Sequence, residues 1–327
     1  MEEQHMASIV QRTLKTCIPY VGTGLHSGCR VGMLVRPAEV NTGVRFVRND
    51  VPTGRGVIPA LWHHVVDTRL GTIIGNELGV SISTVEHLMA ALYGCGIDNA
   101  VVELDGPEVP ILDGSAEPFV AMIERAGVVK QDAKRWAVLV QDTVEVQCDD
   151  KFARLEPCPI ARITAEIEFP GTAVGNQIFS TMITESVFKR DLARARTFGF
   201  ADQIEGLYER KLALGGSANN AILVDGDTVV NEEGLRFHDE FVRHKVLDII
   251  GDLSLAGVPI IGHFHGYKPG HALNQALLRK FMSTERAWSY VALDDFENLP
   301  GIRRLSGALA TTANRVRKAW SRLRVVA

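Results

Sequence analysis

The chain has 327 residues, 46% of them hydrophobic, which is enough for one large domain or two domains of ordinary size with apolar cores. Its formal net charge of -4 and its pI near 6.2 give no global electrostatic reason to expect a nucleic-acid partner. The five cysteines form no C-x-x-C pair, which argues against a disulfide framework and a thiolate zinc site. With neither a signal peptide nor a run of about 18 apolar residues, we expect a cytoplasmic protein.

The first part of the chain predicts short strands joined by loops. Residues 30–35 and 44–47 have the composition of strands, and the intervening segment is rich in Pro, Asn and Gly. Residues 21–28 contain three glycines but match neither phosphate-binding glycine motif, so we expect a tight turn there. His26 in this turn could contact an anionic ligand, although an isolated loop histidine usually has no catalytic role.

Residues 83–94 predict a helix. Ser83 and Glu86 have the form of a capping box, and Gly94 suits the C-terminal end. A glutamate directly before a histidine also suits metal-dependent hydrolysis, because the imidazole of His87 can bind an ion while the carboxylate takes a proton from water. Glu86 therefore has a structural and a catalytic interpretation, and the dipeptide alone does not decide between them.

The middle of the chain predicts a second sheet after a domain boundary. A strand over residues 99–104 and a helix over residues 117–126 complete the first part. The polar run 130–135 marks the boundary that we predict, because strand-like alternation restarts at Trp136. Further strands are predicted over residues 136–140, 144–146, 162–169 and 177–183, and a helix over residues 186–194.

Two later segments have both a structural and a ligand-binding interpretation. Residues 194–200 contain two arginines, a threonine and two phenylalanines, which suit either a helix end packed on the core or a substrate site. Residues 211–224 are mostly small and apolar around a Gly-Gly pair, so they could line an apolar groove or pack in an ordinary core.

Residues 240–252 predict an amphipathic helix, because apolar residues recur at steps of three and four. His244, Asp248 and Asp252 fall on one stripe of it, where an imidazole and a carboxylate could converge on a divalent ion. The alternative is a solvated face with an intrahelical hydrogen bond.

Histidines follow this helix in two places. Residues 258–267 predict a strand on which His263 and His265 share one face, as weaker rival metal ligands. His271 heads a predicted helix that ends near residue 282. The positive end of that helix would lower the pKa of His271 unless a carboxylate such as Asp252 opposes it.

The C-terminal segment 299–327 carries seven Arg or Lys residues and no acid, with apolar residues between them. Such a basic amphipathic segment suits contact with an anionic lipid surface, and the alternative is a solvated or disordered tail.

Five segments together resemble the UDP-3-O-acyl-N-acetylglucosamine deacetylase family of lipid A biosynthesis. They are residues 83–88 (STVEHL), 112–116 (LDGSA), 194–200 (RARTFGF), 244–252 (HKxxDxxxD) and 270–274 (GHALN). The resemblance runs from about residue 11 to residue 298, and only the basic tail departs from it. It implies an α+β fold with two domains of similar topology, 1–133 and 134–298, each a mainly antiparallel sheet layered against two helices. The active site would lie at their interface, and the tail would span 299–327.

The resemblance also implies the chemistry. The substrate would be a UDP-linked acylated amino sugar, UDP-3-O-(3-hydroxyacyl)-N-acetylglucosamine, which loses its N-acetyl group as acetate. One Zn²⁺ per chain, with Fe²⁺ as an alternative in the cell, would be held by His87, His244 and Asp248. Glu86 would be the general base, Lys245 and Thr197 would stabilise the oxyanion, and His271, kept protonated by Asp252, would protonate the leaving amine.

The family's acyl-chain passage would fall on Leu25, Phe200, Ile204, Ala213 and Gly216, and His26 and Phe198 are further candidates for substrate contact. Lys151, Arg194 and Arg196 are the candidates for the UDP group. Two alternatives stay open: a zinc amidase acting on another N-acyl sugar, and a non-catalytic lipid- or nucleotide-binding protein with a structural metal. Three protein ligands without a nearby cysteine favour catalysis, because structural zinc normally has four. We expect a monomer with no nucleic-acid partner, and peripheral contact with the inner membrane through the tail.

Overall fold

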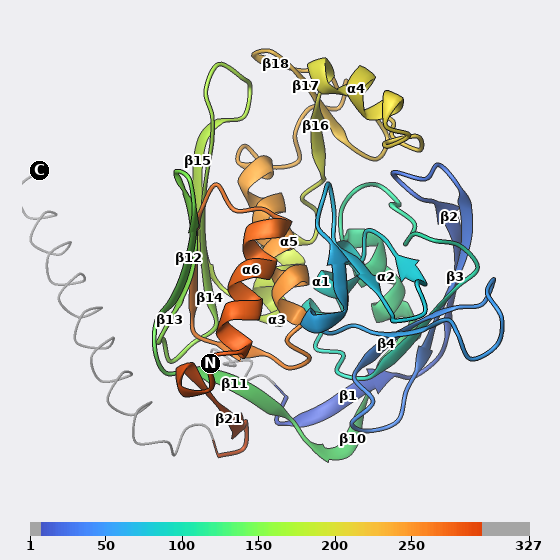
Figure 1. Ribbon diagram of the computed structural model, residues 1–327, viewed down its shortest axis with the longest axis vertical. Coiled ribbons are helices and arrows are strands. Elements are labelled where there is room, and N and C mark those ends of the chain that lie inside the picture. Colours follow the sequence, from blue (N-terminus) through green and yellow to red (C-terminus); the bar gives the residue numbers. More distant parts are fainter. Residues whose placement is uncertain (1–7, 296–327) are drawn as a thin grey trace, which may run out of the picture.

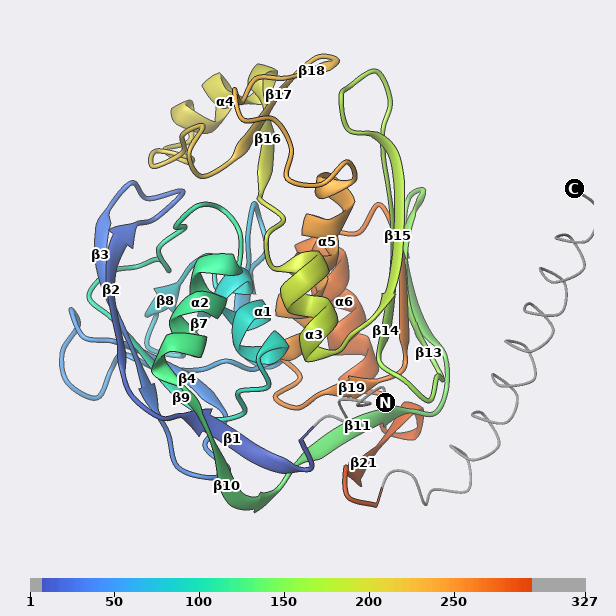
Figure 2. The ribbon, with the colours of Figure 1, turned by 180° about the vertical axis from the view of Figure 1, so that it is seen from behind.

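Two five-stranded sheets form opposite walls of the molecule, and the main helices lie between them (Figures 1 and 2). The structure is a computed structural model and describes residues 8–295. The first sheet has the order β2-β3-β9-β4-β5, formed by Ile18–Thr23, Arg30–Pro37, Ala100–Leu104, Val44–Arg48 and Val57–Pro59. The second has the order β12-β13-β20-β14-β15, formed by Val144–Cys148, Lys151–Glu156, His263–Tyr267, Arg162–Phe169 and Gly175–Met182.

The two sheets have the same connectivity. Each is antiparallel except for one parallel pair, β4 with β9 and β14 with β20. In each sheet the central strand is the one that comes last in the sequence, and one helix precedes it and another follows it in the chain. These are α1 (Glu86–Gly94) and α2 (Glu117–Ala126) around β9, and α5 (Glu240–Ser254) and α6 (His271–Met282) around β20. This arrangement confirms the predicted α+β fold with two halves of similar topology.

Side-chain alternation explains why these elements pack with one face inward. In β3, Val31, Met33 and Val35 are buried, whereas the residues between them are partly or fully exposed. In α2, Phe119 and Ile123 belong to a buried stripe at helical spacing, so the opposite face meets solvent. The helix bounds predicted for residues 117–126 and 271–282 agree with α2 and α6.

Smaller elements complete the fold. Before its first main helix, each half carries an insertion: β6 (Val65–Asp67), β7 (Ile73–Gly75) and β8 (Ser81–Ile82) in the first, and β16 (Phe198–Phe200), α4 (Ile204–Glu209), β17 (Ile222–Asp225) and β18 (Thr228–Val229) in the second. Helix α3 (Glu185–Val187) and a π-helical turn, Phe188–Leu192, precede the second insertion. Short 3-10 turns are Trp62–His64, Ala201–Gln203 and Glu285–Ala287. In Figure 1 the second insertion forms the yellow end of the molecule.

Two narrow sheets lie at the opposite end, where the chain passes from the first half to the second. Strand β1 (Val10–Leu14) pairs with β10 (Val128–Lys134), and β11 (Trp136–Val140) pairs with β19 (Ile260–Ile261) and β21 (Trp288–Ala292). The polar run at the predicted boundary is therefore mostly strand. Within residues 8–295, no sheet combines strands from both sides of Arg135. The division at 133/134 would fall one residue before the end of β10, and it stays a prediction. Residues 296–298 and the predicted tail, 299–327, lie outside the described residues.

Helix α5 is buried almost all round, not on one stripe as an amphipathic surface helix would be. Only Arg243 and Lys245 of its residues are not buried. The alternative interpretation of residues 240–252, a solvated face, is wrong, because α1 and α6 cover that face. At Gly251, an added Cβ would lie 2.1 Å from the carbonyl oxygen of Glu86, so this glycine lets the start of α1 approach the backbone of α5.

Four local predictions were wrong in detail. Ser83 does not cap α1: the N-cap residue is Val85, and no side chain caps the helix. The Glu86 carboxylate accepts the backbone N–H of Thr72 instead. The left-handed residue after α1 is Gly96, whereas Gly94 ends the helix against Phe188. Residues 21–28 are not one turn, since β2 runs to Thr23. The strand predicted over residues 258–267 breaks at Gly262 into β19 and β20, which belong to different sheets. The break comes where the chain passes against Val140.

In the described part of the chain, no helix combines the length and hydropathy needed to span a bilayer.

Candidate active site

Three buried side chains from the two halves converge at one point. His87 is the second residue of α1, and His244 and Asp248 lie one turn apart on α5. One candidate ligand atom from each lies within 4.8 Å of the others. The Nε2 atoms of His87 and His244 lie 3.5 Å and 3.2 Å from Oδ1 of Asp248. In residues 8–295, no other group of three His, Cys, Asp or Glu side chains converges in this way.

The hydrogen bonds of this group favour a cation between its members. The Nδ1–H of His244 donates to the carbonyl oxygen of Ala195 at 3.0 Å, which leaves Nε2 with a lone pair. Burial lowers the pKa of His244, although Asp248 opposes the shift, so the neutral ring predominates near pH 7. That lone pair then faces a carboxylate oxygen for which the described residues supply no hydrogen-bond donor. Two electron-rich atoms at this distance need a cation between them, and two imidazoles with one carboxylate suit a catalytic zinc site.

Asp248 stays ionised in this arrangement. Burial would raise the pKa of this carboxyl, but the neighbouring positive charge of the Lys245 ammonium helps to hold the pKa well below its usual value. The Nζ of Lys245 donates to the other carboxylate oxygen, Oδ2, at 2.8 Å, and it also lies 5.3 Å from the centre of the Phe198 ring. Lys245 therefore orients the carboxylate and keeps Oδ1 directed at the imidazoles.

Glu86 is buried beside the three convergent side chains, and only 3% of its surface is exposed. Burial raises its pKa; the charge of His271 opposes this shift, whereas the carboxylates of Asp252 and Asp248 add to it. Its Oε2 accepts the backbone N–H of Thr72 at 3.0 Å, and its Oε1 lies 3.7 Å from Nε2 of His271. A carboxylate with a raised pKa at a polar site is suited to accept a proton.

His271 begins α6 and holds a proton tightly. Its Nδ1–H donates to Oδ2 of Asp252 at 2.9 Å. Burial disfavours the charged ring, but the carboxylates of Asp252 and Glu86 outweigh burial and raise the pKa of His271 to about 10. The nearby negative charges therefore exceed the opposing effect of the helix end. His271 is therefore an imidazolium whose Nε2–H faces the carboxylate of Glu86.

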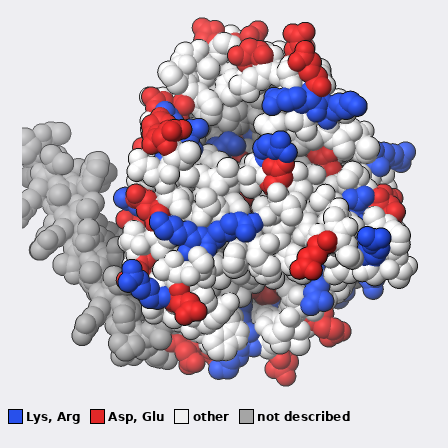
Figure 3. Space-filling model, viewed as in Figure 1, with Lys and Arg blue, Asp and Glu red and all other residues white. Residues whose placement is uncertain are grey.

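Most of these side chains line one side of a pocket of about 620 Å³ between the two halves: Glu86, His87, His244, Lys245, Asp248 and His271. Of the residues predicted for the substrate, Leu25, Lys151 and Phe198 line it, together with Thr197. Residues that the sequence did not single out also line it, including Leu70, Gln147, Cys148 and Lys268. The face seen in Figure 3 is hollowed in its upper half, and acidic and basic side chains are interspersed over the surrounding surface.

Two of the remaining predicted substrate residues, Arg194 and Arg196, do not line this pocket. Arg196 is 2% exposed, and its guanidinium pairs with Glu240 at 2.9 Å and Glu233 at 2.7 Å, so it cannot meet a diphosphate there. Arg194 is exposed and lies 3.6 Å from Glu117. Both arginines therefore pair with carboxylates. Those carboxylates lie outside the segment 194–200, so the segment alone could not reveal them.

The predicted apolar passage is only partly assembled around the pocket. Phe200 packs on Phe169 and Phe198, with ring centres 5.3 Å and 6.0 Å apart. Ile204 begins α4 in the second insertion. The loop with Ala213 and Gly216 meets the loop of Leu25, since the N–H of Gly215 donates to the Leu25 carbonyl at 3.0 Å.

His26 belongs to the same loop contact. Its Nε2 lies 2.9 Å from the carbonyl oxygen of Leu70, and the backbone N–H of Ala213 points at its Nδ1 at 3.4 Å. Its ring thus links the two insertions beside Leu25 and Leu70, which line the pocket.

The rival histidines on β20 have other partners. His263 Nε2 lies 2.9 Å from the Thr164 hydroxyl, and His265 Nε2 lies 2.9 Å from a carboxylate oxygen of Glu166. Their rings stack with centres 6.1 Å apart, so their nitrogens do not converge.

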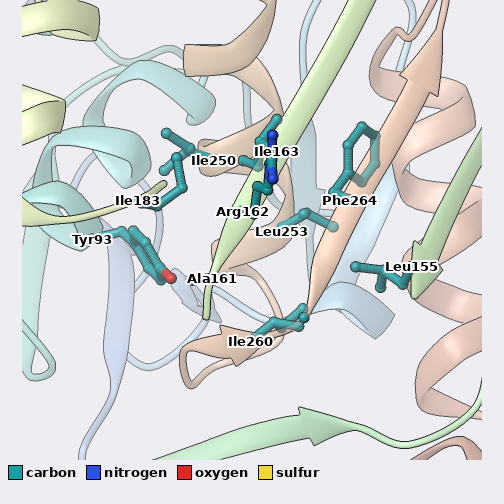
Figure 4. A pocket seen from close by; sticks show the side chains of 11 residues that line it. Tyr93, Leu155, Ala161, Arg162, Ile163, Ile183, Ile250, Leu253, Ile260 and Phe264 are labelled. Atoms are coloured by element: carbon teal, nitrogen blue, oxygen red, sulfur yellow. The ribbon is translucent and has the colours of Figure 1, made fainter. Parts of the chain in front are cut away.

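A second, much smaller pocket lies beneath the second sheet (Figure 4). Its lining is mainly aliphatic and aromatic, with Ile250 and Leu253 of α5 facing Phe264 of β20 and Tyr93 of α1. None of the catalytic candidates lines it. We therefore treat it as imperfect core packing and place the chemistry in the larger pocket.

Comparison with known proteins gives consistent matches over most of the chain. A family model described as LpxC, UDP-3-O-acyl N-acetylglycosamine deacetylase, matches residues 11–283. The UDP-3-O-acyl-N-acetylglucosamine deacetylase of Myxococcus xanthus (strain DK1622) is 50% identical over 286 residues, which are 87% of this chain and 90% of that protein. The protein of the same name from Acidithiobacillus ferrooxidans (strain ATCC 53993 / BNL-5-31) is 49% identical over 285 residues, 86% of this chain and 93% of that one. The one from Pasteurella multocida (strain Pm70) is 47% identical over 294 residues, 89% and 96%.

Proposed function

Because this chain belongs to the UDP-3-O-acyl-N-acetylglucosamine deacetylase family, we propose that it removes the N-acetyl group of UDP-3-O-(3-hydroxyacyl)-N-acetylglucosamine as acetate, in lipid A biosynthesis. The observation that carries this proposal is the meeting of His87 with His244 and Asp248 across the two halves, beside Glu86 and His271. The same arrangement argues against a structural metal site, because two proton-transfer groups directly adjoin it.

We propose Zn²⁺ as the ion held by these three side chains, with Fe²⁺ as the alternative in the cell. When bound, the ion would act as a Lewis acid that lowers the pKa of a water molecule and polarises the acetamide carbonyl. The donor set of two imidazoles and one carboxylate leaves a position open for such exchangeable ligands.

Two side chains would move the protons. Glu86 would take a proton from the attacking water, because its buried carboxylate has a raised pKa and faces the site. As the bond between the carbonyl carbon and nitrogen breaks, the Nε2–H of His271 would be given to the departing amine. This second step is required because an amine anion is too basic to leave unprotonated. Asp252 would hold Nδ1–H, so that only Nε2 is turned towards the substrate.

Lys245 and Thr197 would stabilise the negative charge that develops on the carbonyl oxygen. Both line the pocket, one on α5 and the other just before β16. The Lys245 ammonium has three donor hydrogens, so one can stay on Asp248 while another meets the oxyanion.

The rest of the pocket would hold the substrate's two extensions. Leu25, Phe198 and Leu273 offer apolar surface for the acyl chain, whereas Lys151 and Lys268 offer cations for the diphosphate. Lys268 is already paired with Asp150 and Glu168 at 2.7 Å and 2.9 Å, which reduces the charge that it presents. Lys151 is therefore the stronger candidate.

Acetate release by the purified protein tests this function. Activity should need both the UDP group and the 3-O-acyl chain, should disappear on chelation, and should return with one equivalent of Zn²⁺. Full activity after chelation would refute the metal mechanism. Equal activity on N-acetylglucosamine itself would point to an amidase of broader specificity.

Two further proposals, on membrane contact and on oligomeric state, rest on the sequence alone. We propose that the basic segment 299–327 makes peripheral contact with anionic membrane, and that the protein is a cytoplasmic monomer. Unchanged binding to anionic vesicles after removal of residues 303–327 would refute the first proposal. A molar mass in solution above that of one chain would refute the second.

A further inference from the structure

Thr72, between Gly71 and β7, contacts both of the candidate proton-transfer groups. It is 1% exposed. Its backbone N–H donates to Oε2 of Glu86 at 3.0 Å, and its hydroxyl donates to Oδ1 of Asp252 at 2.5 Å. Its Oγ1 also lies 3.3 Å from Nδ1 of His271. Both hydrogen-bond donors of one residue are therefore directed at the catalytic machinery.

The hydroxyl completes the set of donors around Asp252. Oδ2 of this carboxylate accepts the Nδ1–H of His271 at 2.9 Å and an amide N–H of Asn274 at 2.8 Å. Oδ1 accepts the Thr72 hydroxyl. Since the single hydroxyl hydrogen is directed at Asp252, Thr72 can only accept from the imidazole. Hydrogen bonds to both oxygens thus fix the orientation of the Asp252 carboxylate. The carboxylate in turn orients the His271 ring, which donates a hydrogen bond to it.

The backbone of Thr72 acts in the same way on Glu86. Its N–H holds Oε2, which leaves Oε1 as the oxygen that faces Nε2 of His271 at 3.7 Å. The carbonyl of Thr72 accepts the N–H of Val85, directly before α1, at 3.3 Å. The segment is therefore tied to the start of the helix that carries Glu86.

These contacts cross the boundary between the halves. Thr72 and Glu86 belong to the first half, whereas Asp252, His271 and Asn274 belong to the second. We propose that Thr72 is a positioning residue that holds the general base and the general acid in register across this boundary. The inference rests on the proposed deacetylase function. It assigns to Thr72 no contact with substrate and no proton transfer of its own.

A purely structural threonine provides the contrast. Thr13 is also buried, at 6% exposure, but its hydroxyl donates to the backbone carbonyl of Asn99 at 2.7 Å, in the β1 region. Loss of either hydroxyl removes a buried hydrogen bond, so both changes should lower the melting temperature. Only the change at Thr72 should alter the chemical step.

The test compares Thr72→Val, Thr72→Ser and Thr13→Val with the wild-type holoenzyme. We expect Thr72→Val to lower kcat by about 10-fold to 100-fold, the usual effect of losing a hydrogen bond to a charged group. KM should stay within about twofold and bound metal near one per chain, because Thr72 does not line the pocket and its hydroxyl contacts none of the three candidate metal ligands. Thr72→Ser should restore most of kcat, and Thr13→Val should leave kcat unchanged.

A second measurement is independent of turnover. The Nδ1–H of His271 should give a low-field proton resonance, assigned by its loss in His271→Gln, and Thr72→Val should shift it while Thr13→Val does not. The inference is overturned if Thr72→Val keeps the wild-type kcat, if Thr72→Ser is as slow as Thr72→Val, or if the resonance does not move. If the wild-type protein released no acetate, the proposed function would fail, whereas the resonance would still report whether Thr72 positions His271.

Discussion

The two ends of the main pocket are built differently. At the inner end, Glu86, His87, His244 and Asp248 are each at most 4% exposed, and neighbouring groups orient them. At the outer end, Leu70, Cys148 and Lys151 are exposed and belong to strand ends or loops. An inner end with fixed geometry suits bond breaking, whereas an adaptable outer end suits the binding of a long substrate. Substitutions at the inner end should therefore change kcat, and those at the outer end should change KM.

The largest effect should come from the two proton-transfer groups. We expect Glu86→Ala and His271→Ala each to lower kcat by about 100-fold or more, while bound metal, which we propose to be zinc, stays near one per chain. His87→Ala should lose the metal as well as the rate. Steady-state kinetics with metal analysis of each variant measures both quantities. If Glu86→Ala or His271→Ala lost its zinc, that residue would have to be reassigned as a ligand.

Arg196 is a buried arginine outside the pocket, so its loss should lower stability and leave substrate binding unchanged. Arg196→Ala leaves Glu240, which is 0% exposed, without its cationic partner. We expect the free energy of unfolding to fall by about 3–5 kcal/mol, because a buried charge loses its counter-ion. Urea denaturation monitored by circular dichroism measures this change. KM of the folded enzyme should not move, and a tenfold higher KM would return Arg196 to the substrate site.

The pH profile tests the charge balance at the inner end. The rate should rise with pH as Glu86 loses its proton, above the usual carboxyl range because its pKa is raised. It should fall again as pH passes through the pKa of His271, about 10, where the acid loses its proton. In Asp252→Asn the imidazolium loses its nearest carboxylate, so the alkaline limb should move to lower pH. An unmoved limb would show that another group supplies that proton.

The smallest effect should come from the outer end. Lys151 lines the pocket and is exposed, so Lys151→Ala should raise KM by about tenfold and change kcat little. The matched control is Lys130→Ala, which removes an exposed lysine on β10. Equal kinetics for the two variants would place the diphosphate elsewhere in the pocket. A fall in kcat alone would contradict the division between the two ends.

Sequence patterns predicted the parts of the molecule that depend on local periodicity. The bounds of α2 and α6 followed from helical spacing and from the residues that end each helix. The placing of His244 and Asp248 on one face of α5 followed from the helical turn. The family resemblance, which the comparisons confirm, supplied His87 from the other half. The deep burial of α5 was missed, because it depends on which elements pack around it.

The wrong prediction for Arg196 and the omission of Thr72 have a common cause. Arg196 suited an anion site by charge, but its partner Glu240 lies 44 residues away, and only the fold brings the two together. Thr72 is 180 residues from Asp252 in sequence and belongs to no motif. Long-range pairing of polar groups leaves no periodic signal. The residues that orient a site are therefore harder to find from one sequence than those that perform its chemistry.

The division of the three proposed metal ligands between α1 and α5 has a consequence for folding. Neither half alone contains the full donor set, so tight binding requires both halves to be folded and docked. Bound ion should therefore stabilise the docked state through mass action, by an amount that grows with the free ion concentration. The ion would therefore hold the two halves together as well as take part in the reaction. The fall in melting temperature on addition of a chelator would measure this contribution to stability.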